Sequence, residues 1–248
     1  MEFVRLFILQ LIAHLLADFF FQNDIWSRHK RMHGFRSKVL YWHILITFLL
    51  SWGFSFRLSF ISFSLIIAIL HFLVDGFKGR IGEIKIGKKR PFRKSLFLID
   101  QCTHILIIAI AVFLFRNMFE IKQLWSLPVT NHRLLVILGY LFCLKPSNVI
   151  IKEVFTVNNF KLTVNSNKKS DSELLDAGSL IGNIERFLTL SLLLMGQYGA
   201  IGFILAGKSI LRYEGQKTAK TEYVLIGTLL SFGIAITTGI LILKSGIN

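Results

Sequence analysis

Long runs of apolar residues recur along the whole chain, at about residues 3–22, 39–56, 58–77, 95–115, 133–144, 180–206 and 223–243. A helix needs about 20 mainly apolar residues to cross a bilayer, and most of these runs approach that length. The composition agrees, with 53% hydrophobic residues, 24 phenylalanines and a mean hydropathy of +0.60. The sequence therefore predicts an all-α integral membrane protein, a polytopic bundle of about six to seven transmembrane helices.

The formal charge of +15 is concentrated in two segments between apolar runs. "SRHKRMHGFRSK" and "KGRIGEIKIGKKRPFRK" hold five and eight Lys/Arg residues, whereas only Arg57 stands between the second and third runs. Multi-pass proteins retain such basic loops on the cytoplasmic side. We therefore expect both segments in the cytoplasm, and we attribute the basic excess to them and not to a nucleic-acid partner.

The order of the runs predicts three regions. Residues 1–118 form a four-helix transmembrane domain, residues 119–178 a short helix plus a polar cytoplasmic linker, and residues 179–248 a C-terminal membrane domain. Pro146 would break or kink a helix. Three glycines in "MGQYGAIG" divide the sixth run, so residues 180–213 could form two half-helices of a re-entrant hairpin. The alternative, in which these residues form a single long helix followed by an unusually basic outer loop, remains open.

Histidine and aspartate stand four residues apart three times within the apolar runs, as His14/Asp18 in "HLLADFFFQ", His71/Asp75 in "HFLVD" and Asp100/His104 in "DQCTH". On a helix, residues four apart share one face, about 5–6 Å from each other. The pairs lie near the ends of the first and third helices and the start of the fourth. Because neighbouring helices alternate in direction, all three pairs should reach one depth, where His43 at the start of the second helix joins them.

Ionisable groups in a bilayer cost several kcal/mol each unless they are paired or bound to a metal. A divalent cation would compensate them, and imidazole with carboxylate suits zinc, manganese or iron. We therefore predict a metal site, best suited to zinc, with the ligands His14, Asp18, His71, Asp75, Asp100 and His104. Cys102 should lie on the face of its helix opposite to Asp100 and His104. With Cys143 as the one other cysteine, no thiolate metal site is indicated. A single His–Asp pair can instead merely fix helix packing.

The motifs "HLLADFFFQ", "HFLVDGFK" and "LFLIDQCTH" resemble those of a bacterial membrane family, domain of unknown function 3307, over roughly residues 1–115. Residues 180–231 also resemble the C-terminal part of its longer members. The His/Asp layout is similar, by analogy, to that of membrane-bound metal-dependent hydrolases. The resemblance implies a multi-pass protein of the bacterial inner (cytoplasmic) membrane, and it carries no established function.

Our leading hypothesis is a metal-dependent hydrolase that acts on a lipid or amphiphilic substrate at the cytoplasmic leaflet. An activated water would attack, and His43 would be the catalytic acid. Arg186, Lys208 and Arg212 would bind an anionic headgroup. The alternative is that Lys208 or Arg212 forms an ion pair with Glu185 or Glu222.

Two alternatives remain, a transporter or channel for metal ions or protons and a structural membrane subunit with a bound metal. Transport needs polar positions that continue to the far side, and beyond the cluster the sequence shows chiefly serines, Ser51, Ser55, Ser59, Ser62 and Ser64. Such hydroxyls could line a narrow path, but more often they pack helices. The substrate and the oligomeric state are left open.

Overall fold

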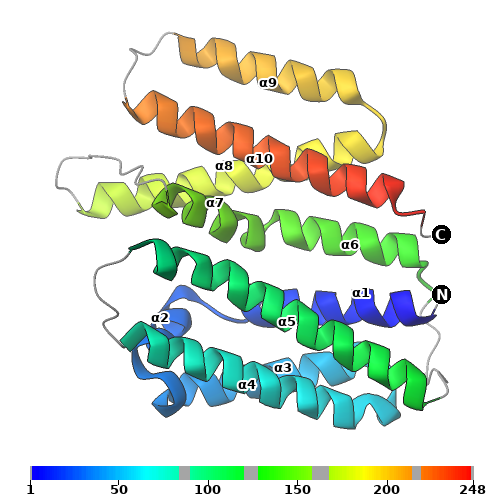
Figure 1. The fold of residues 1–248 in the computed structure, drawn as a ribbon. Helices are drawn as coiled ribbons and strands as arrows, with labels where there is room; N and C mark the ends of the chain where they lie inside the picture. The colour runs from blue at the N-terminus through cyan, green and yellow to red at the C-terminus, as the bar shows by residue number, and fades with distance from the viewer. Residues whose placement is uncertain (1, 84–89, 120–127, 158–167, 214–218, 247–248) are drawn as a thin grey trace. The chain divides into compact units, whose positions relative to one another are not determined.

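The computed structural model is all-helical over the residues that it describes (Figure 1). It describes the chain apart from residues 1, 84–89, 120–127, 158–167, 214–218 and 247–248, and apart from the side chains of 79–83, 90–96, 156–157, 168–177, 211–213 and 219–223. Two compact units, Met1–Leu138 and Gly139–Asn248, are described separately below. The region boundaries at residues 118 and 178 remain predictions.

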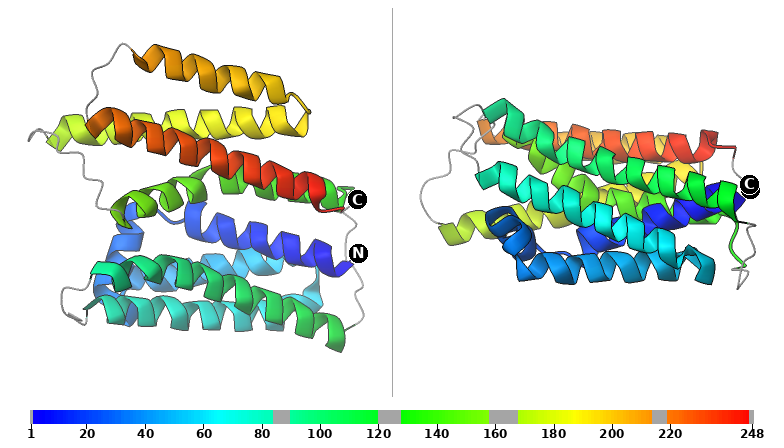
Figure 2. Two further views of the ribbon diagram at one scale, coloured as in Figure 1. Left: turned by 45° about the horizontal axis from the view of Figure 1, so that its top comes forward. Right: turned by 60° about the horizontal axis from the view of Figure 1, so that its bottom comes forward.

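The first unit is built on four long helices that contact one another in a ring. They are α1 (Glu2–Leu15), α3 (Lys38–Ser55), α4 (Ile61–Glu83) and α5 (Arg90–Met118). Helix α1 packs against α3 and α5, and α4 packs between α3 and α5, so the ring is closed. Figures 1 and 2 show the four helices side by side, with successive helices running in opposite directions.

The interior of this bundle contains buried polar residues beside an apolar core, and large apolar residues face outward. On α3 the buried side carries His43, Thr47, Ser51 and Ser55. Large apolar side chains are instead exposed, among them Tyr41, Trp42, Leu45 and Leu49 of α3 and Leu65, Ile66, Ile69 and Leu70 of α4. A soluble bundle would expose mainly polar side chains, whereas lipid solvates an outer surface of apolar side chains. The pattern identifies a membrane protein.

Four helical segments in the described residues are long and apolar enough to cross a bilayer, namely Glu2–Phe20, Leu58–Lys78, Phe97–Met118 and Val224–Lys244. The bent pair Asn131–Cys143 and Lys145–Phe155 would make five. The predicted number of six to seven is therefore not confirmed. Helix α3, with 18 residues, is not among these segments.

The first basic segment contains a helix, α2 (Asp24–His33), followed by a 3₁₀ turn (Gly34–Arg36). The side chain of Asn23 accepts a hydrogen bond from the Trp26 amide at 2.8 Å, which caps the helix N-terminus. The 3₁₀ turn is anchored on α4 because the Phe35 ring lies directly over Gly76, where an added Cβ would come within 2.0 Å of it. This docking holds α2 against α4. Residues 84–89 of the second basic segment lie outside the described residues.

Helix α6 (Asn131–Cys143) contains the boundary between the two units, and a 41° bend just before Pro146, where the sequence predicts a kink, joins it to α7 (Lys145–Val157). Proline has no N–H to donate to the Phe142 carbonyl. The Ser147 hydroxyl donates to that carbonyl instead, at 2.7 Å. Residues 145–157 thus form a helix, and their apolar residues Val149, Ile150, Ile151, Val154 and Phe155 supply one of its faces.

The sixth apolar run is broken as its glycines predict. Helix α8 (Lys168–Leu194) ends at a turn in which Gly196 has φ +73°, and α9 (Tyr198–Tyr213) follows and contacts α8. A φ in this range favours glycine because it has no Cβ. Helix α10 (Ala219–Lys244) packs closely along α8, where Gly239 meets Leu193. Whether the α8–α9 hairpin re-enters the membrane remains a prediction.

The contact between Phe35 and Gly76 gives a test of how α2 is held. Gly76→Ala should lower the free energy of unfolding by about 1–3 kcal/mol, because the added methyl group overlaps the ring. Gly53→Ala is the matched control, since nothing lies within 4 Å of an added Cβ there. That change should be neutral or stabilising by roughly 1 kcal/mol through helix propensity. Apparent melting temperatures in detergent would compare the two, and equal effects would contradict the packing described.

Candidate metal centre

Histidine and aspartate side chains from all four bundle helices meet at the end of the bundle where α2 lies. His14 comes from α1, Asp18 from the turn that follows it, His43 from α3, His71 and Asp75 from α4, and His104 from α5. Their side chains are nearly or fully buried, and Asp18, the most exposed of them, is only 10% exposed. The predicted convergence at one depth is therefore present for these six residues.

Asp18 lies in a π-helical segment, Leu16–Phe20, that continues α1. The Phe21 amide donates to the Leu16 carbonyl at 2.9 Å, the i to i+5 bond of this wider turn. A π turn changes the rotation per residue, so Asp18 is not positioned by regular α-helical spacing from His14. π turns often occur at functional sites. This turn places the Asp18 carboxylate next to side chains from two other helices.

The tightest group in the cluster is formed by Asp18, His43 and His71. The two Nε2 atoms lie 3.1 Å apart, and the Asp18 Oδ1 lies 3.5 Å from His43 Nε2 and 3.4 Å from His71 Nε2. Ligand atoms about 2.0–2.1 Å from a tetrahedral zinc are separated by about 3.3–3.4 Å. The three atoms thus already have nearly the spacing of three corners of a zinc coordination tetrahedron.

Asp75 lies beside this group but has a cationic partner. Its Oδ2 is 3.7 Å from His43 Nε2 and 3.8 Å from His71 Nε2, and it accepts a hydrogen bond from the buried ammonium group of Lys30 on α2. The sequence analysis missed Lys30, which it assigned with its neighbours to a solvated loop. No sequence signal separates it from the other basic residues of that segment.

Asp100 is separated from the histidines by its own partners. Its Oδ2 accepts from Lys78 Nζ at 2.5 Å and from Gln101 Nε2 at 3.3 Å, and no ion pair with His104 is found among the described side chains. The helical spacing brings Asp100 and His104 to one face, but Lys78 from α4 draws the carboxylate away. Asp100 is therefore not part of the groups that could hold a metal. Cys102 is exposed.

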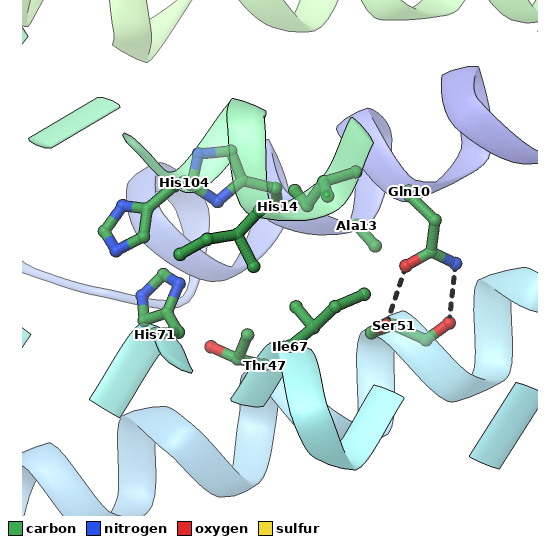
Figure 3. Close-up of a pocket in the computed structure, with 10 residues that line it drawn as sticks. Gln10, Ala13, His14, Thr47, Ser51, Ile67, His71 and His104 are labelled. Carbon is green, nitrogen blue, oxygen red and sulfur yellow. Dashed lines mark hydrogen bonds between the residues drawn. The ribbon is translucent and has the colours of Figure 1, made fainter. Parts of the chain in front are cut away.

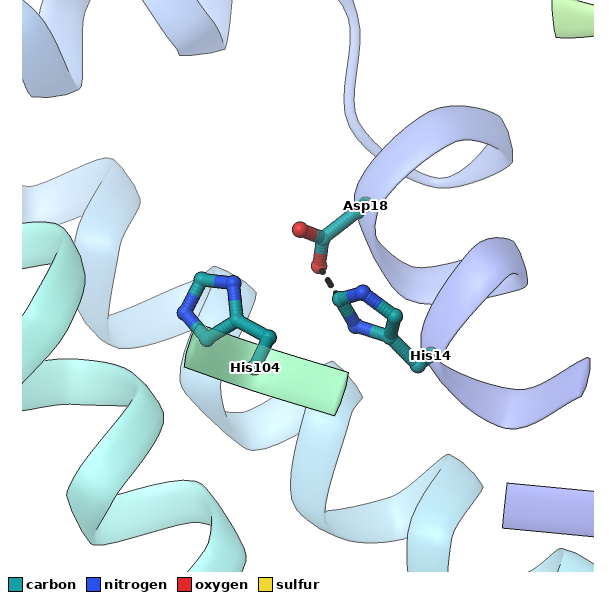
Figure 4. A group of neighbouring side chains, drawn as sticks. All are labelled: His14, Asp18 and His104. Atoms are coloured by element: carbon teal, nitrogen blue, oxygen red, sulfur yellow. Dashed lines mark ion pairs between the residues drawn. The ribbon is translucent and has the colours of Figure 1, made fainter. Parts of the chain in front are cut away.

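His14 and His104 line the other side of Asp18 (Figure 4). His14 Nδ1 lies 3.6 Å from Asp18 Oδ1, and the His104 ring stacks on His71 with centroids 3.8 Å apart. Neither ring nitrogen of His14 or of His104 has a hydrogen-bond partner, although both residues are buried. Buried polar atoms normally have a partner, and their lack here indicates a missing proton, water or cation.

The charges of the cluster do not balance on their own. Lys30 compensates Asp75 and Lys78 compensates Asp100, whereas the ion pairs of Asp18 are to histidines alone. The Asp18 Oδ1 has no hydrogen bond. A buried, uncompensated carboxylate is costly, so a cation or a protonated imidazole must accompany it. Nitrogen and oxygen donors at coordination spacing could supply a divalent metal site.

A small cavity borders the cluster on the side toward the bundle centre (Figure 3). Its volume is about 10 Å³, and its lining includes His14, His71 and His104 at one end and Thr47, Ser51 and Gln10 at the other. A volume of this size is about the minimum for one water molecule. The cavity could therefore hold a single small polar species next to the cluster, and it excludes a lipid chain.

Two of the three residues predicted to bind a headgroup, Arg186 and Lys208, have partners within the protein. Arg186 is buried in the second unit, where it donates to the Cys143 carbonyl, to Ser231 at 2.8 Å and to Asn148 and Asn183 at 2.5 and 2.8 Å. It thus ties together α6, α7, α8 and α10. Lys208 forms an ion pair with Glu185, the alternative considered for it. The side chains of Arg212 and Glu222 lie outside the described residues.

The comparison with family models decides the affiliation of the chain. Residues 6–135, just over half of the sequence, match the family described as protein of unknown function DUF3307. The chain belongs to the DUF3307 family. This match includes all six clustered His/Asp residues and does not extend to the predicted resemblance over residues 180–231. No curated protein and no solved structure matches, so the similarity to metal-dependent hydrolases receives no support from these comparisons.

The ion pair between Lys30 and Asp75 can be tested by a double-mutant cycle. Lys30→Met should destabilise the protein by about 3–5 kcal/mol, because it leaves a buried carboxylate without its cation. Lys30→Met/Asp75→Asn should recover much of that loss, and Lys38→Met, at an exposed position, should have little effect. Thermal unfolding in detergent measures all three. Additive effects of Lys30→Met and Asp75→Asn would contradict the pairing.

Proposed function

We propose that the DUF3307 unit is a membrane-embedded, metal-dependent hydrolase whose cation is held by Asp18, His43 and His71. The observation that supports this most strongly is the mutual spacing of 3.1–3.5 Å between their three ligand atoms, inside a closed apolar bundle. Two imidazole nitrogens and one carboxylate oxygen, with no thiolate, make zinc the best-suited metal. The cation also compensates the one aspartate of the cluster that has no lysine partner.

Three protein ligands favour a catalytic zinc over a structural one, because structural sites are closed by four ligands. Among the described side chains, Asp75 offers a second carboxylate beside this group, and Lys30 engages it. We therefore assign Asp75 to orienting the site. His43 is assigned as a ligand and not as the catalytic acid predicted from the sequence, because its Nε2 lies within 3.5 Å of both other ligand atoms.

When bound, the metal would lower the pKa of a coordinated water toward neutrality and polarise the scissile bond. His14 or His104, whose ring nitrogens have no hydrogen-bond partner, would take up the proton that the attacking water loses. The oxygen of that water would form a bond to the phosphorus or carbonyl carbon of the substrate. The bond to the leaving oxygen breaks, and that oxygen takes up the proton from the histidine. The reaction consumes one water and leaves the histidines unchanged.

The proposed substrate is a lipid or amphiphile that reaches the site from the surface of the cytoplasmic leaflet of the bacterial inner membrane. The internal cavity is too small for a chain, so the scissile group has to approach from the end at which α2 lies. Arg28 and Arg31, exposed on α2, supply positive charge there, whereas Lys78 is paired with Asp100. Each such residue contributes about 1 kcal/mol of attraction to an acidic leaflet. Arg186 is no longer proposed as a headgroup ligand.

Elemental analysis of the purified protein tests the metal site. We expect about one zinc per wild-type chain and a loss of at least tenfold in His43→Ala, His71→Ala and Asp18→Asn. His33→Ala is the matched control, because this exposed histidine of α2 should leave the metal content unchanged. Equal metal in all five preparations, or none in the wild type, would contradict the site.

Hydrolysis is tested separately with the zinc-loaded protein in detergent, using phospholipid and acyl-ester substrates. His14→Gln/His104→Gln should retain the metal and lose at least about 100-fold in rate, the scale of general acid–base catalysis. Bound zinc with no turnover of either substrate class would overturn the enzymatic proposal and favour a structural or transported metal.

A further inference from the structure

The Asp75 carboxylate stands beside the proposed cation site without being one of its ligands. Its Oδ2 lies 3.7 Å from His43 Nε2 and 3.8 Å from His71 Nε2. The corners of a zinc tetrahedron are about 3.3–3.4 Å apart, so this oxygen is within about 0.5 Å of ligand spacing from both imidazoles. A small movement of the carboxylate would therefore make it a fourth ligand.

Lys30 opposes that movement. Its ammonium group donates to Asp75 Oδ2, the same oxygen that lies near the two imidazoles. Both side chains are at most 9% exposed, so little water competes for the bond. An oxygen engaged by a buried ammonium group offers less negative charge to a metal cation, and the ammonium group itself repels that cation. The pair of Lys30 and Asp75 therefore favours an empty fourth coordination position.

The helix that carries Lys30, α2, is not one of the four bundle helices and docks beside the ligands. The Phe35 ring, in the 3₁₀ turn that follows α2, lies over Gly76, the residue next to the aspartate. The same ring packs edge to face against Phe72 and Phe77, with centroids 5.3 Å apart in both cases. These contacts anchor α2 on the part of α4 that supplies the ligands, and they bring the ammonium group of Lys30 to that level.

A second pair of lysine and aspartate at this end of the bundle lacks the ligand spacing. Lys78 Nζ donates to Asp100 Oδ2 at 2.5 Å, and Gln101 donates to the same oxygen at 3.3 Å. Asp100 belongs to none of the groups of described side chains that could hold a metal. A lysine that merely neutralises a buried carboxylate can therefore lie away from the ligands. Lys30 differs because its partner oxygen also borders two ligand nitrogens.

We propose that Lys30 is a positioning residue that keeps Asp75 out of the coordination sphere of the cation. This inference rests on the proposed cation site of Asp18, His43 and His71. With Lys30 in place, the cation has three protein ligands and one open position, the arrangement of catalytic zinc sites. Without Lys30, Asp75 becomes the fourth ligand, and the site takes the closed form of a structural zinc site.

The charge of the site predicts a sign that separates this role from packing. Lys30 adds a positive charge beside a divalent cation, and its removal leaves the cation with two carboxylates in place of one. Loss of Lys30 should therefore strengthen metal binding, although it removes a buried ion pair. A residue that only supported the ligands would have the opposite effect, because loss of such support weakens metal binding.

Zinc affinity of the full-length protein in detergent, measured by competition with a chromophoric chelator, tests this sign. Lys30→Met should bind zinc at least about tenfold more tightly than the wild type, the scale on which outer-shell partners change metal affinity. Lys30→Met/Asp75→Asn removes both charges and the fourth ligand, so it should lose that gain. Zinc is supplied during purification, because metal bound to the closed site offsets the loss of the ion pair.

Cobalt in place of zinc shows whether a coordination position is open. Added azide binds the cobalt ion where no protein ligand fills a position, and its binding shifts the visible absorption of the metal. We expect this shift in the wild type and in Lys30→Met/Asp75→Asn, and its loss in Lys30→Met. Lys78→Met is the matched control, because it also removes a lysine from a buried ion pair and should keep the azide shift. Lys30→Arg, which retains the cation, should keep it too.

An azide shift that persists in Lys30→Met, or weaker zinc binding by that variant, would overturn this inference and leave the cation site intact. A wild type that binds cobalt but gives no azide shift would also overturn it, since the fourth position would already be filled. If Lys30→Met does not fold, Lys30→Met/Asp75→Asn still decides, because a tenfold loss of zinc affinity there would show that Asp75 is already a ligand. A wild type without any metal would remove the cation site itself, and this inference with it.

Discussion

The end of the first unit buries three carboxylates and pairs only two of them with lysine ammonium groups. Lys30 and Lys78 neutralise Asp75 and Asp100, and they leave Asp18 surrounded by imidazoles from three helices. In an apolar bundle with little water, such an imbalance costs several kcal/mol unless a cation or a proton joins it. The metal proposal follows from this single uncompensated charge and from the imidazole nitrogens that face it.

The alternation of helix direction, together with the position of His/Asp pairs at helix ends, was enough to predict from the sequence that they converge. That prediction needed only residue numbers and helical periodicity, and it holds for His14, Asp18, His43, His71, Asp75 and His104. It failed for Asp100, whose partner Lys78 comes from the neighbouring helix. Periodicity states which face a side chain occupies, but it does not state which competing partner the side chain meets on that face.

Two features that shape the site have no sequence signature that periodicity can detect. The π turn at Leu16–Phe20 changes the direction of Asp18, and nothing in the letters of "LADFF" distinguishes it from an α-helical turn. Lys30 reaches Asp75 because Phe35 docks over Gly76, a contact between residues 41 positions apart. In the second unit the glycines and Pro146 did indicate the breaks in the helices, since their effect on the backbone is local. The packing role of Arg186, by contrast, could not be predicted from local sequence, because its hydroxyl and amide partners, Ser231 and Asn148, come from separate helices.

The central claim is that imidazoles and a carboxylate from separate helices surround one cation. X-ray absorption at the zinc edge, on protein loaded with one equivalent of zinc in detergent, measures that coordination directly. The account predicts a first shell of nitrogen and oxygen only, at about 2.0–2.1 Å, with the outer-shell scattering of about two imidazole rings. A shell of water oxygens without imidazole scattering, or one with sulfur at about 2.3 Å, would contradict it.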